Sequence, residues 1–426
     1  MSKKIIKSNF IDSADVAQLN LRANYYMLIK DGVIVDLVTE IPADWSAVSI
    51  VDYSAGFVIP PFVDAHVHAP QYNNRGLGLD MELLDWLDTY TFPEERKFGA
   101  ADYAKRTYKQ FINALWRNGS LASVVFASIH KGASLELANL MIAAGLKSFI
   151  GKVNMDQNSP DYYIEDGAES FAETRAFIDA IPHSARVKPI ITPRFAPSCS
   201  AELLVKLGDL AKQSGLSVQS HLSENQKEID WVKSLFPNCE SYGDVYDSCG
   251  LMVPDYKTIM AHCVFLKESE KRLLSDKQIV VAHCPHSNAN LASGIAPIAE
   301  FVARDIPVAL GSDISGGNDM FIGRAMQLAL MLSNMYWVHE DKSYGKLSFE
   351  NVFYFATRSG GKLFGELGAF DVGYAADFLV IDDSGLRDLN ERNLKERLQR
   401  FVYCGDDRQI SERYIDGEIV KKPFDI

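Results

Sequence analysis

The amino-acid sequence predicts an α/β fold: a TIM (β/α)8 barrel flanked by a small β-sandwich formed from both chain ends. Through the middle of the 426-residue chain, apolar strand-like segments alternate with helical patterns, which is typical of a parallel sheet. Hairpin patterns lie near both ends. Polar side chains recur where the central strand segments end, and this is the end of a barrel that carries active sites.

The two ends of the chain have the same β-rich character. Residues 26–30 and 33–38 are apolar segments on either side of Asp31-Gly32, a pair that favours a two-residue hairpin. Near the C-terminus, a strand pattern over 377–381 precedes a second hairpin around Asp416-Gly417. We therefore expect a β-sandwich formed by residues 1–59 and 366–426, and a barrel formed by residues 60–365.

The central region contains eight candidate strands, and eight β/α units over roughly 300 residues are what a TIM barrel requires. Helical patterns lie between the strands, such as residues 103–116 with Gly119 just past the end. An open doubly wound sheet is disfavoured because no Gly-x-Gly-x-x-Gly turn follows the first strand. The expected strands cover residues 56–68, 123–127, 148–153, 187–195, 217–221, 258–262, 279–283 and 308–313.

Charge and composition restrict the classes of function. The chain has 43 lysines and arginines against 56 aspartates and glutamates, a net charge of −13. This acidic balance, without a basic cluster, argues against nucleic acid and favours a neutral small-molecule substrate. No segment is apolar and long enough for a membrane span or a signal peptide, so we expect a cytoplasmic protein with no membrane partner. The six cysteines show no Cys-x-x-Cys spacing.

Histidines and an aspartate mark the ends of four expected strands. His66 and His68 are two residues apart and so point to the same side of one strand. His221, His262 and Asp313 end three later strands. A lone histidine there is more often structural, but several at equivalent positions need a group to coordinate, because unpartnered buried polar atoms are costly. Imidazole nitrogen and carboxylate oxygen suit a catalytic zinc or a similar divalent ion.

This pattern resembles the amidohydrolase superfamily of metal-dependent hydrolases and deaminases, whose barrel is often flanked by a β-sandwich. The resemblance implies one metal ion, Zn²⁺ or alternatively Fe²⁺, bound by His66, His68, His221 and Asp313. It implies that His262 holds the metal-bound water. Many binuclear members carry a carboxylated lysine at the end of the fourth strand. Here that strand ends in Thr192-Pro193-Arg194-Phe195, and Lys188 lies at its opposite end, which argues for a single metal.

Further segments narrow the resemblance to the guanine deaminases, and it covers almost the whole chain. It implies hydrolytic deamination of guanine to xanthine and ammonia, a step of purine catabolism, by a homodimer. Arg194 would donate to the guanine carbonyl, because a guanidinium has only donors. Gln71 would read the neighbouring edge and Phe195 would cover a ring face. The matching segments are residues 66–72, 86–93, 192–195, 220–225, 283–288 and 311–317.

Glu224 is the expected carrier of protons and is also expected to contact the substrate. It follows His221 by three residues, so a short turn would bring its carboxylate over the metal, where a leaving amine needs an acid. The alternative is a carboxylate in the first turn of a helix that Ser223 caps and that runs to Phe236. In the expected mechanism His262 and Asp313 orient the attacking water, and Asp313 is a second proton carrier.

The substrate-binding residues and the reaction also have alternatives. Arg194 could pair with an acidic neighbour, which the adjacent Phe195 and Pro197 disfavour, and Phe195 could simply pack in the core. Another amidohydrolase reaction, on a cyclic amide or a different heterocycle, would share the metal and the fold. A non-enzymatic scaffold is a third possibility, which the intact ligand set opposes. A cytidine-deaminase-type site would need His-x-Glu and Pro-Cys-x-x-Cys, and neither pattern is present.

Overall fold

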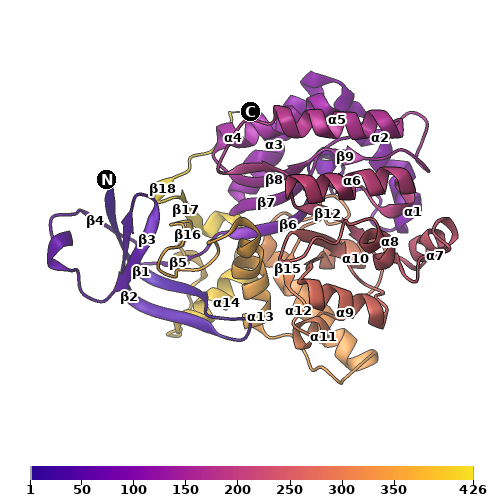
Figure 1. Ribbon diagram of the computed structural model, residues 1–426. Coiled ribbons are helices and arrows are strands. Elements are labelled where there is room, and N and C mark those ends of the chain that lie inside the picture. The colour runs from indigo at the N-terminus through magenta and orange to yellow at the C-terminus, as the bar shows by residue number, and fades with distance from the viewer. Residues whose placement is uncertain (1, 426) are drawn as a thin grey trace.

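The computed structural model describes residues 2–425, which form a sheet containing both chain ends and a larger body of alternating strands and helices (Figure 1). The terminal sheet has the strand order β18-β17-β16-β5-β1-β2-β3, with β4 paired to β1. Strands from opposite ends of the sequence, indigo and yellow in Figure 1, therefore lie in one sheet. Its strands are β1 (Lys3–Ser13), β2 (Leu19–Lys30), β3 (Val33–Val38), β4 (Ile50–Asp52), β5 (Phe57–Ile59), β16 (Phe378–Ile381), β17 (Ile410–Ile415) and β18 (Glu418–Ile419).

The expected pairing of the two chain ends is confirmed. β5 pairs antiparallel with β16, where Val58 lies opposite Val380, and parallel with β1. Both hairpins form around the expected turns, β2 with β3 and β17 with β18. All these strands belong to one hydrogen-bonded sheet, so the two-layered β-sandwich and the domain boundaries stay predictions.

The larger body has a TIM-barrel-type α/β fold. Its parallel strands run in the orders β10-β8-β7-β6 and β12-β13-β14-β15, with β11 and β9 as a separate pair. Outside these ladders, Asp313 N–H donates to the His66 carbonyl and Ile191 N–H to the Ser217 carbonyl, which joins the groups at two junctions. The strands are β6 (Phe62–His68), β7 (Ser120–Phe126), β8 (Lys147–Gly151), β9 (Val153–Asn154), β10 (Val187–Pro189), β11 (Thr192–Pro193), β12 (Val218–Leu222), β13 (Thr258–His262), β14 (Val280–His283) and β15 (Val308–Leu310).

Three of the expected strands are divided. Pro60 and Pro61 separate β5, in the terminal sheet, from β6, in the larger body, because proline has no N–H to donate to a ladder. The expected strand 148–153 is interrupted at Lys152, where the pairing changes from β8 with β10 to β9 with β11. The expected strand 187–195 is accordingly split into β10 and β11.

Helices cover the strands of the larger body in Figure 1. α3, expected over 103–116, begins two residues earlier and ends one later; it buries Tyr108, Phe111, Ile112 and Leu115 on one face, the spacing of an amphipathic helix. The helices are α1 (Leu83–Trp86), α2 (Phe92–Glu95), α3 (Ala101–Arg117), α4 (Lys131–Ala144), α5 (Gly167–Ala180), α6 (Ala201–Ser214), α7 (Gln226–Leu235), α8 (Tyr242–Ser248), α9 (Glu268–Lys277), α10 (Pro285–Asn290), α11 (Ile298–Ala303), α12 (Ile322–His339), α13 (Phe349–Tyr354) and α14 (Leu394–Cys404).

Mostly small and branched side chains from or beside successive strands form a buried cluster. A barrel interior packed in this way is a core rather than a channel, so a site must lie at one of its ends. The cluster consists of Ala65, Val124, Phe149, Ile190, Ile259, Ala261, Val280, Ala282 and Ala309.

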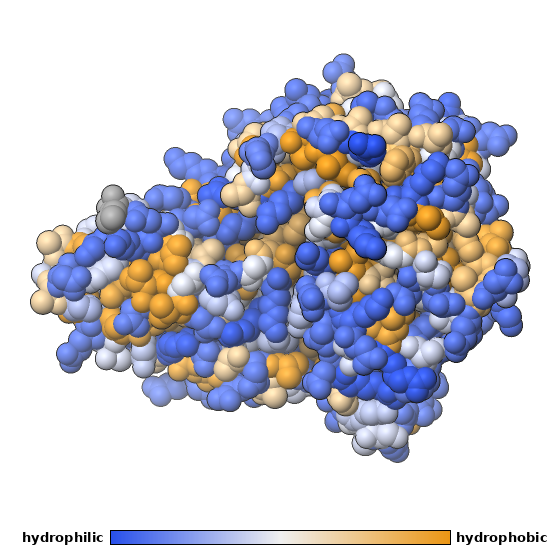
Figure 2. Space-filling view, viewed as in Figure 1, coloured by the Kyte–Doolittle hydropathy of each residue, from blue (hydrophilic) through white to orange (hydrophobic). Residues whose placement is uncertain are grey.

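Hydrophilic residues cover most of the face seen in Figure 2, with separate hydrophobic patches, one of them over the terminal sheet. Within residues 2–425, none of the helices combines the length and the apolar character needed to cross a bilayer.

Candidate active site

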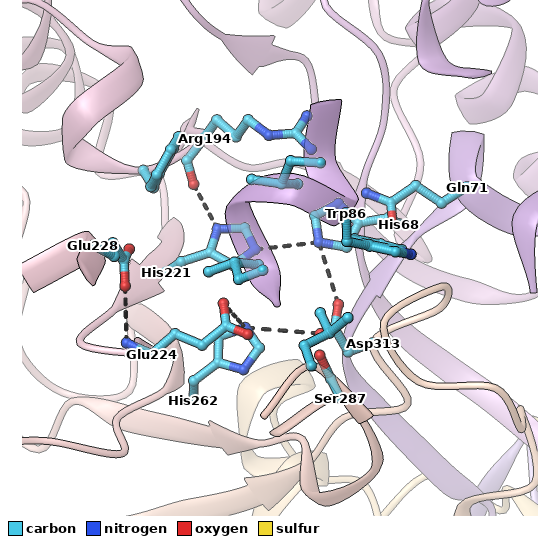
Figure 3. A pocket seen from close by; sticks show the side chains of 14 residues that line it. His68, Gln71, Trp86, Arg194, His221, Glu224, Glu228, His262, Ser287 and Asp313 are labelled. Carbon is cyan, nitrogen blue, oxygen red and sulfur yellow. Dashed lines mark hydrogen bonds and ion pairs between the residues drawn. The ribbon is translucent and has the colours of Figure 1, made fainter. Parts of the chain in front are cut away.

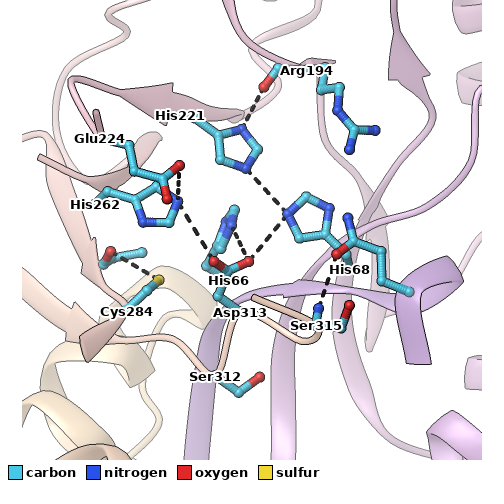
Figure 4. A network of polar contacts seen from close by, with 12 residues as sticks. His66, His68, Arg194, His221, Glu224, His262, Cys284, Ser312, Asp313 and Ser315 are labelled. Atoms are coloured by element: carbon cyan, nitrogen blue, oxygen red, sulfur yellow. Dashed lines mark hydrogen bonds and ion pairs between the residues drawn. The ribbon is translucent and has the colours of Figure 1, made fainter. Parts of the chain in front are cut away.

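The histidines and the aspartate expected at the strand ends meet in one place (Figure 4). β6 carries His66 and His68, β12 carries His221, β13 ends at His262, and Asp313 follows the end of β15. All except His221 are at most 5% exposed. Parallel strands bring their carboxyl ends to the same edge, which explains how residues almost 250 positions apart in sequence come into contact.

Ring nitrogens converge on a common point. His68 Nε2 lies 3.2 Å from His221 Nε2 and 3.4 Å from Asp313 Oδ1, and His66 Nε2 lies 3.2 Å from the same oxygen. Among the described residues, the Nε2 atoms of His66 and His262 have no hydrogen-bond partner. The Nε2 atoms of His68 and His221 face each other, and that of His66 lies beside a carboxylate without a hydrogen-bond partner. Burying these atoms together is costly unless a cation binds them. The ligand atoms of His66, His68 and His221 lie within 4.8 Å of one another, so this set fits one divalent ion with nitrogen and oxygen ligands.

The electrostatics favour metal ligation. Burial lowers the pKa of His68 and of His221 well below the usual range, and the neighbouring His66 lowers both further. Burial opposes ionisation of Asp313, but the adjacent His66 and His262 hold the pKa of its carboxyl well below its ordinary value. Metals bind neutral imidazoles and ionised carboxylates, and these protonation states require no proton release at neutral pH.

One backbone oxygen and one side-chain oxygen orient the rings of His221 and His262. The Arg194 carbonyl accepts from His221 Nδ1 at 2.6 Å, and Asn288 Oδ1 accepts from His262 Nδ1 at 2.8 Å. With the proton on Nδ1, the lone pair of each Nε2 points into the site. His262 and Asp313 have φ angles of 72° and 47°, a left-handed conformation that costs non-glycine residues about 1–3 kcal/mol and is concentrated at functional sites.

Asp64 fixes the loop that carries Asp313. Its carboxylate, two residues before His66 on β6, accepts from Ser312 N–H at 2.9 Å and from Ser312 Oγ at 2.5 Å. Burial raises the pKa of Asp64 to about 6, although the Ser312 bonds oppose this shift. The strand and the loop are therefore joined directly behind the ligand positions.

Glu224 lies between the end of β12 and the start of α7. The predicted helix cap at Ser223 is wrong: Asn225 caps α7, because Asn225 Oδ1 accepts from Lys227 N–H and Glu228 accepts in return from Asn225 N–H. Glu224 is thus outside the helix, and its Oε2 lies 3.3 Å from His262 Nε2. Burial, and next the charge of Asp313, raise its pKa to about 8. Such a carboxyl can both accept and donate a proton near neutral pH.

A cavity adjoins this cluster, and its lining side chains are shown in Figure 3. Its mixture of apolar walls with a few polar groups is typical of small-molecule sites. The polar lining contains His68, Gln71, Arg194, His221, Glu224, Glu228, His262, Ser287 and Asp313, and the apolar lining contains Leu83, Trp86, Leu87, Phe195 and Leu291.

All four expected substrate-binding residues, Gln71, Arg194, Phe195 and Glu224, line this cavity. Phe195 is both a wall and a packing residue, since its ring meets Trp231 edge-to-face at 6.1 Å. For Arg194, the expectation that it lacks an acidic partner is wrong. Glu95, 99 residues earlier, pairs with its guanidinium at 2.6 Å, which sequence neighbours alone could not reveal.

Some polar residues at strand ends stay outside the cavity. His283 is buried and is absent from the lining; burial, and next the neighbouring His262, lower its pKa to about 3. Lys188 is exposed on β10, away from the site. Three residues of the site are not among the expected site residues: Glu95, Trp86 and Asn288. Trp86 and Asn288 lie within segments that carry the resemblance, whereas Glu95 lies two residues past the end of one.

Comparisons with known proteins place this site in a family. The profile of the Amidohydrolase family matches residues 57–420. The chain belongs to the amidohydrolase family. Its members use bound metal, which agrees with the cluster at the strand ends.

Several guanine deaminases are similar to this chain over nearly its whole length. A guanine deaminase of Dictyostelium discoideum is 38% identical over 98% of both chains, and one of Escherichia coli K12 is 32% identical over 98% of this chain and 97% of its own. The crystal structure of a guanine deaminase from C. acetobutylicum, with guanine bound in its active site, has a TM-score of 0.96 and 42% identity, covering 99% of this chain and all of the other.

Proposed function

We propose that this amidohydrolase is a guanine deaminase, which converts guanine and water to xanthine and ammonia. The observation that carries the proposal is that one cavity joins the histidine–aspartate cluster to Arg194 and Gln71, two polar residues suited to reading a purine edge. The similarity to a guanine-bound deaminase over the whole chain supports guanine rather than another heterocycle. Structures of an adenosine deaminase and of triazine hydrolases are only 17–21% identical to this chain and share its fold alone.

We propose that His66, His68, His221 and Asp313 hold one zinc ion, with Fe²⁺ as the alternative. When bound, such an ion lowers the pKa of a water that it coordinates to about 7 and so supplies hydroxide at neutral pH. Lys188 is remote from the cluster, which supports a single ion.

The protein groups then orient the reactants and move the protons. Arg194 donates to O6 of guanine, Gln71 hydrogen-bonds the adjacent edge, and Phe195 covers a face of the ring. His262 Nε2 and the Asp313 carboxylate orient the water toward C2.

Glu224 carries the proton. Its carboxylate takes a proton from the attacking water and delivers it to N3 of the purine. The hydroxyl group now on C2 then gives up its remaining proton, which Glu224, with Asp313 as a second carrier, passes to the departing C2 amine. Ammonia leaves, and the C2–N bond of guanine is replaced by the C2–O bond of xanthine.

A panel of heterocycles tests this assignment. Purified protein is incubated with guanine, adenine, cytosine, a pterin and a cyclic amide, and ammonia release is measured. We expect guanine to have the highest kcat/KM. A higher value for another member would assign a different amidohydrolase reaction. The cytoplasmic homodimer expected from the resemblance stays a proposal, which cell fractionation and sedimentation equilibrium test.

A further inference from the structure

We infer that Glu95 is a positioning residue that makes the enzyme selective for a purine with a carbonyl at C6. This inference rests on the proposed function. Glu95 is the last residue of α2 and is 1% exposed. It is absent from the cavity lining, whereas both residues that it holds, Gln71 and Arg194, are part of that lining. It therefore acts on the substrate through other side chains.

The carboxylate of Glu95 hydrogen-bonds both Arg194 and Gln71, the two residues proposed to recognise the purine edge. Its Oε2 accepts from Arg194 Nη1 at 2.6 Å, and its Oε1 accepts from Arg194 Nη2 at 3.2 Å and from Gln71 Nε2 at 2.8 Å. All three side chains are at most 3% exposed. Charge-assisted bonds of this two-pronged kind fix direction as well as distance. Residues from three separate segments of the chain thereby become one rigid unit.

The contacts of Gln71 define which end of its amide is the donor. Nε2 faces the Glu95 carboxylate, which only accepts, and Oε1 accepts from the backbone N–H of Ser315 at 3.0 Å. Turning the amide by 180° would oppose two acceptors at one end and two donors at the other. Glu95 thus fixes the donor and acceptor pattern that Gln71 presents to a ligand.

Arg194 depends on the same carboxylate. Two of its five N–H groups are used by Glu95, so the other donors are held in fixed directions, and the paired charge can be buried in an apolar surrounding. Its guanidinium also lies over the ring of Phe92, with 5.1 Å to the ring centre. A purine without a carbonyl at this place would leave the buried donors unpaired, which is a strong basis for rejection.

The test compares guanine with 2-aminopurine, which has the same reacting amine but a hydrogen in place of O6. For Glu95→Gln we expect the ratio of kcat/KM for guanine to that for 2-aminopurine to fall about tenfold or more, because only guanine uses the fixed donors. Glu95→Asp keeps the charge and should recover part of the ratio. A residue that supports only the fold would lower both kcat/KM values equally and leave the ratio unchanged.

Glu94→Gln is the matched control. Glu94 is the neighbouring residue on α2 and is also buried. It binds Lys97, Tyr103 and Asn73 but contacts neither Gln71 nor Arg194. Its variant should keep the wild-type ratio. If Glu95→Gln does not fold, Glu95→Asp is measured in its place and should still show a reduced ratio. An unchanged ratio in the folded variant overturns the inference, whereas a wild type that does not deaminate guanine overturns the proposed function instead.

Discussion

Glu224 is a buried carboxylate with few partners. Ser293 Oγ donates to its Oε1 at 3.1 Å, while His262 Nε2 faces its Oε2 and the charge of Asp313 opposes its ionisation. In Glu228, four residues later, both carboxylate oxygens already accept hydrogen bonds. Oε1 accepts from Tyr242 OH, and Oε2 accepts from two backbone N–H groups. Of these two glutamates, Glu224 is therefore the one free to exchange protons with a ligand.

Replacing Glu224 by glutamine should separate metal binding from turnover. The amide keeps the shape but cannot carry a proton, so we expect kcat for guanine to fall by about 10²–10⁴. The metal content, measured by elemental analysis, should match the wild type because Glu224 is outside the ligand set. Glu202→Gln, on the exposed surface of α6, should retain wild-type activity. Full activity of Glu224→Gln would remove this residue from the mechanism.

At the scale of elements, the bond between β6 and the loop after β15 determines where Asp313 lies. Asp64 forms this bond, and its folded-state pKa of about 6 exceeds the ordinary value of 3.8. A raised carboxyl pKa means that the folded protein binds a proton more tightly than the unfolded chain. The stability linked to Asp64 is therefore present below about pH 4 and is lost as the pH rises through about 6.

Asp64→Asn should abolish this loss of stability. Asparagine can accept from Ser312 N–H and donate to Ser312 Oγ without a charge. Between pH 4 and pH 7 we expect the free energy of unfolding of the variant to improve relative to the wild type by about 3 kcal/mol. Urea unfolding of both proteins in the presence of chelator measures the difference, and the shared titration of the histidines cancels. A difference that does not change with pH would show that Asp64 has an ordinary pKa in the folded protein.

The sequence predicts elements whose signal is local. Alternation places His66 and His68 on one side of a strand, and β/α order places His221, His262 and Asp313 at the same edge. The division of the first expected strand could also have been predicted, since Pro60 and Pro61 stand within it.

Contacts between distant segments could not be predicted in this way. Glu95 with Arg194, and Asn288 with His262, are pairs whose partners lie on different elements, and no periodicity relates them. Ser223 and Asn225 are both good capping residues, so the sequence alone does not decide which of them caps α7. Only the three-dimensional path after β12 places Asn225 at the helix start.

At the scale of the whole molecule, the metal cluster joins strands from both halves of the larger body. β6 begins this body and β15 ends its strands, and His66 and Asp313 meet where these two elements are hydrogen-bonded. An ion bound here would connect both halves and stabilise the folded state by mass action.

Removing the metal should therefore lower global stability. When the free metal concentration is about 1,000 times Kd, the expected contribution is about 4 kcal/mol. Thermal unfolding before and after dialysis against chelator measures it, and added zinc should restore the original transition. The His68→Ala/His221→Ala variant is the control, since chelator should leave its transition unchanged. An identical transition for the chelated and the zinc-loaded wild type would contradict a metal at this cluster.

In the proposed reaction, a single bound metal and the cavity beside it deaminate guanine. Elemental analysis of the purified protein, combined with the absorbance change from guanine to xanthine, tests both parts together. We predict one divalent ion per chain and one xanthine formed for each guanine consumed, with activity lost on chelation and regained on reloading. Metal-loaded protein that leaves guanine unchanged would contradict the account.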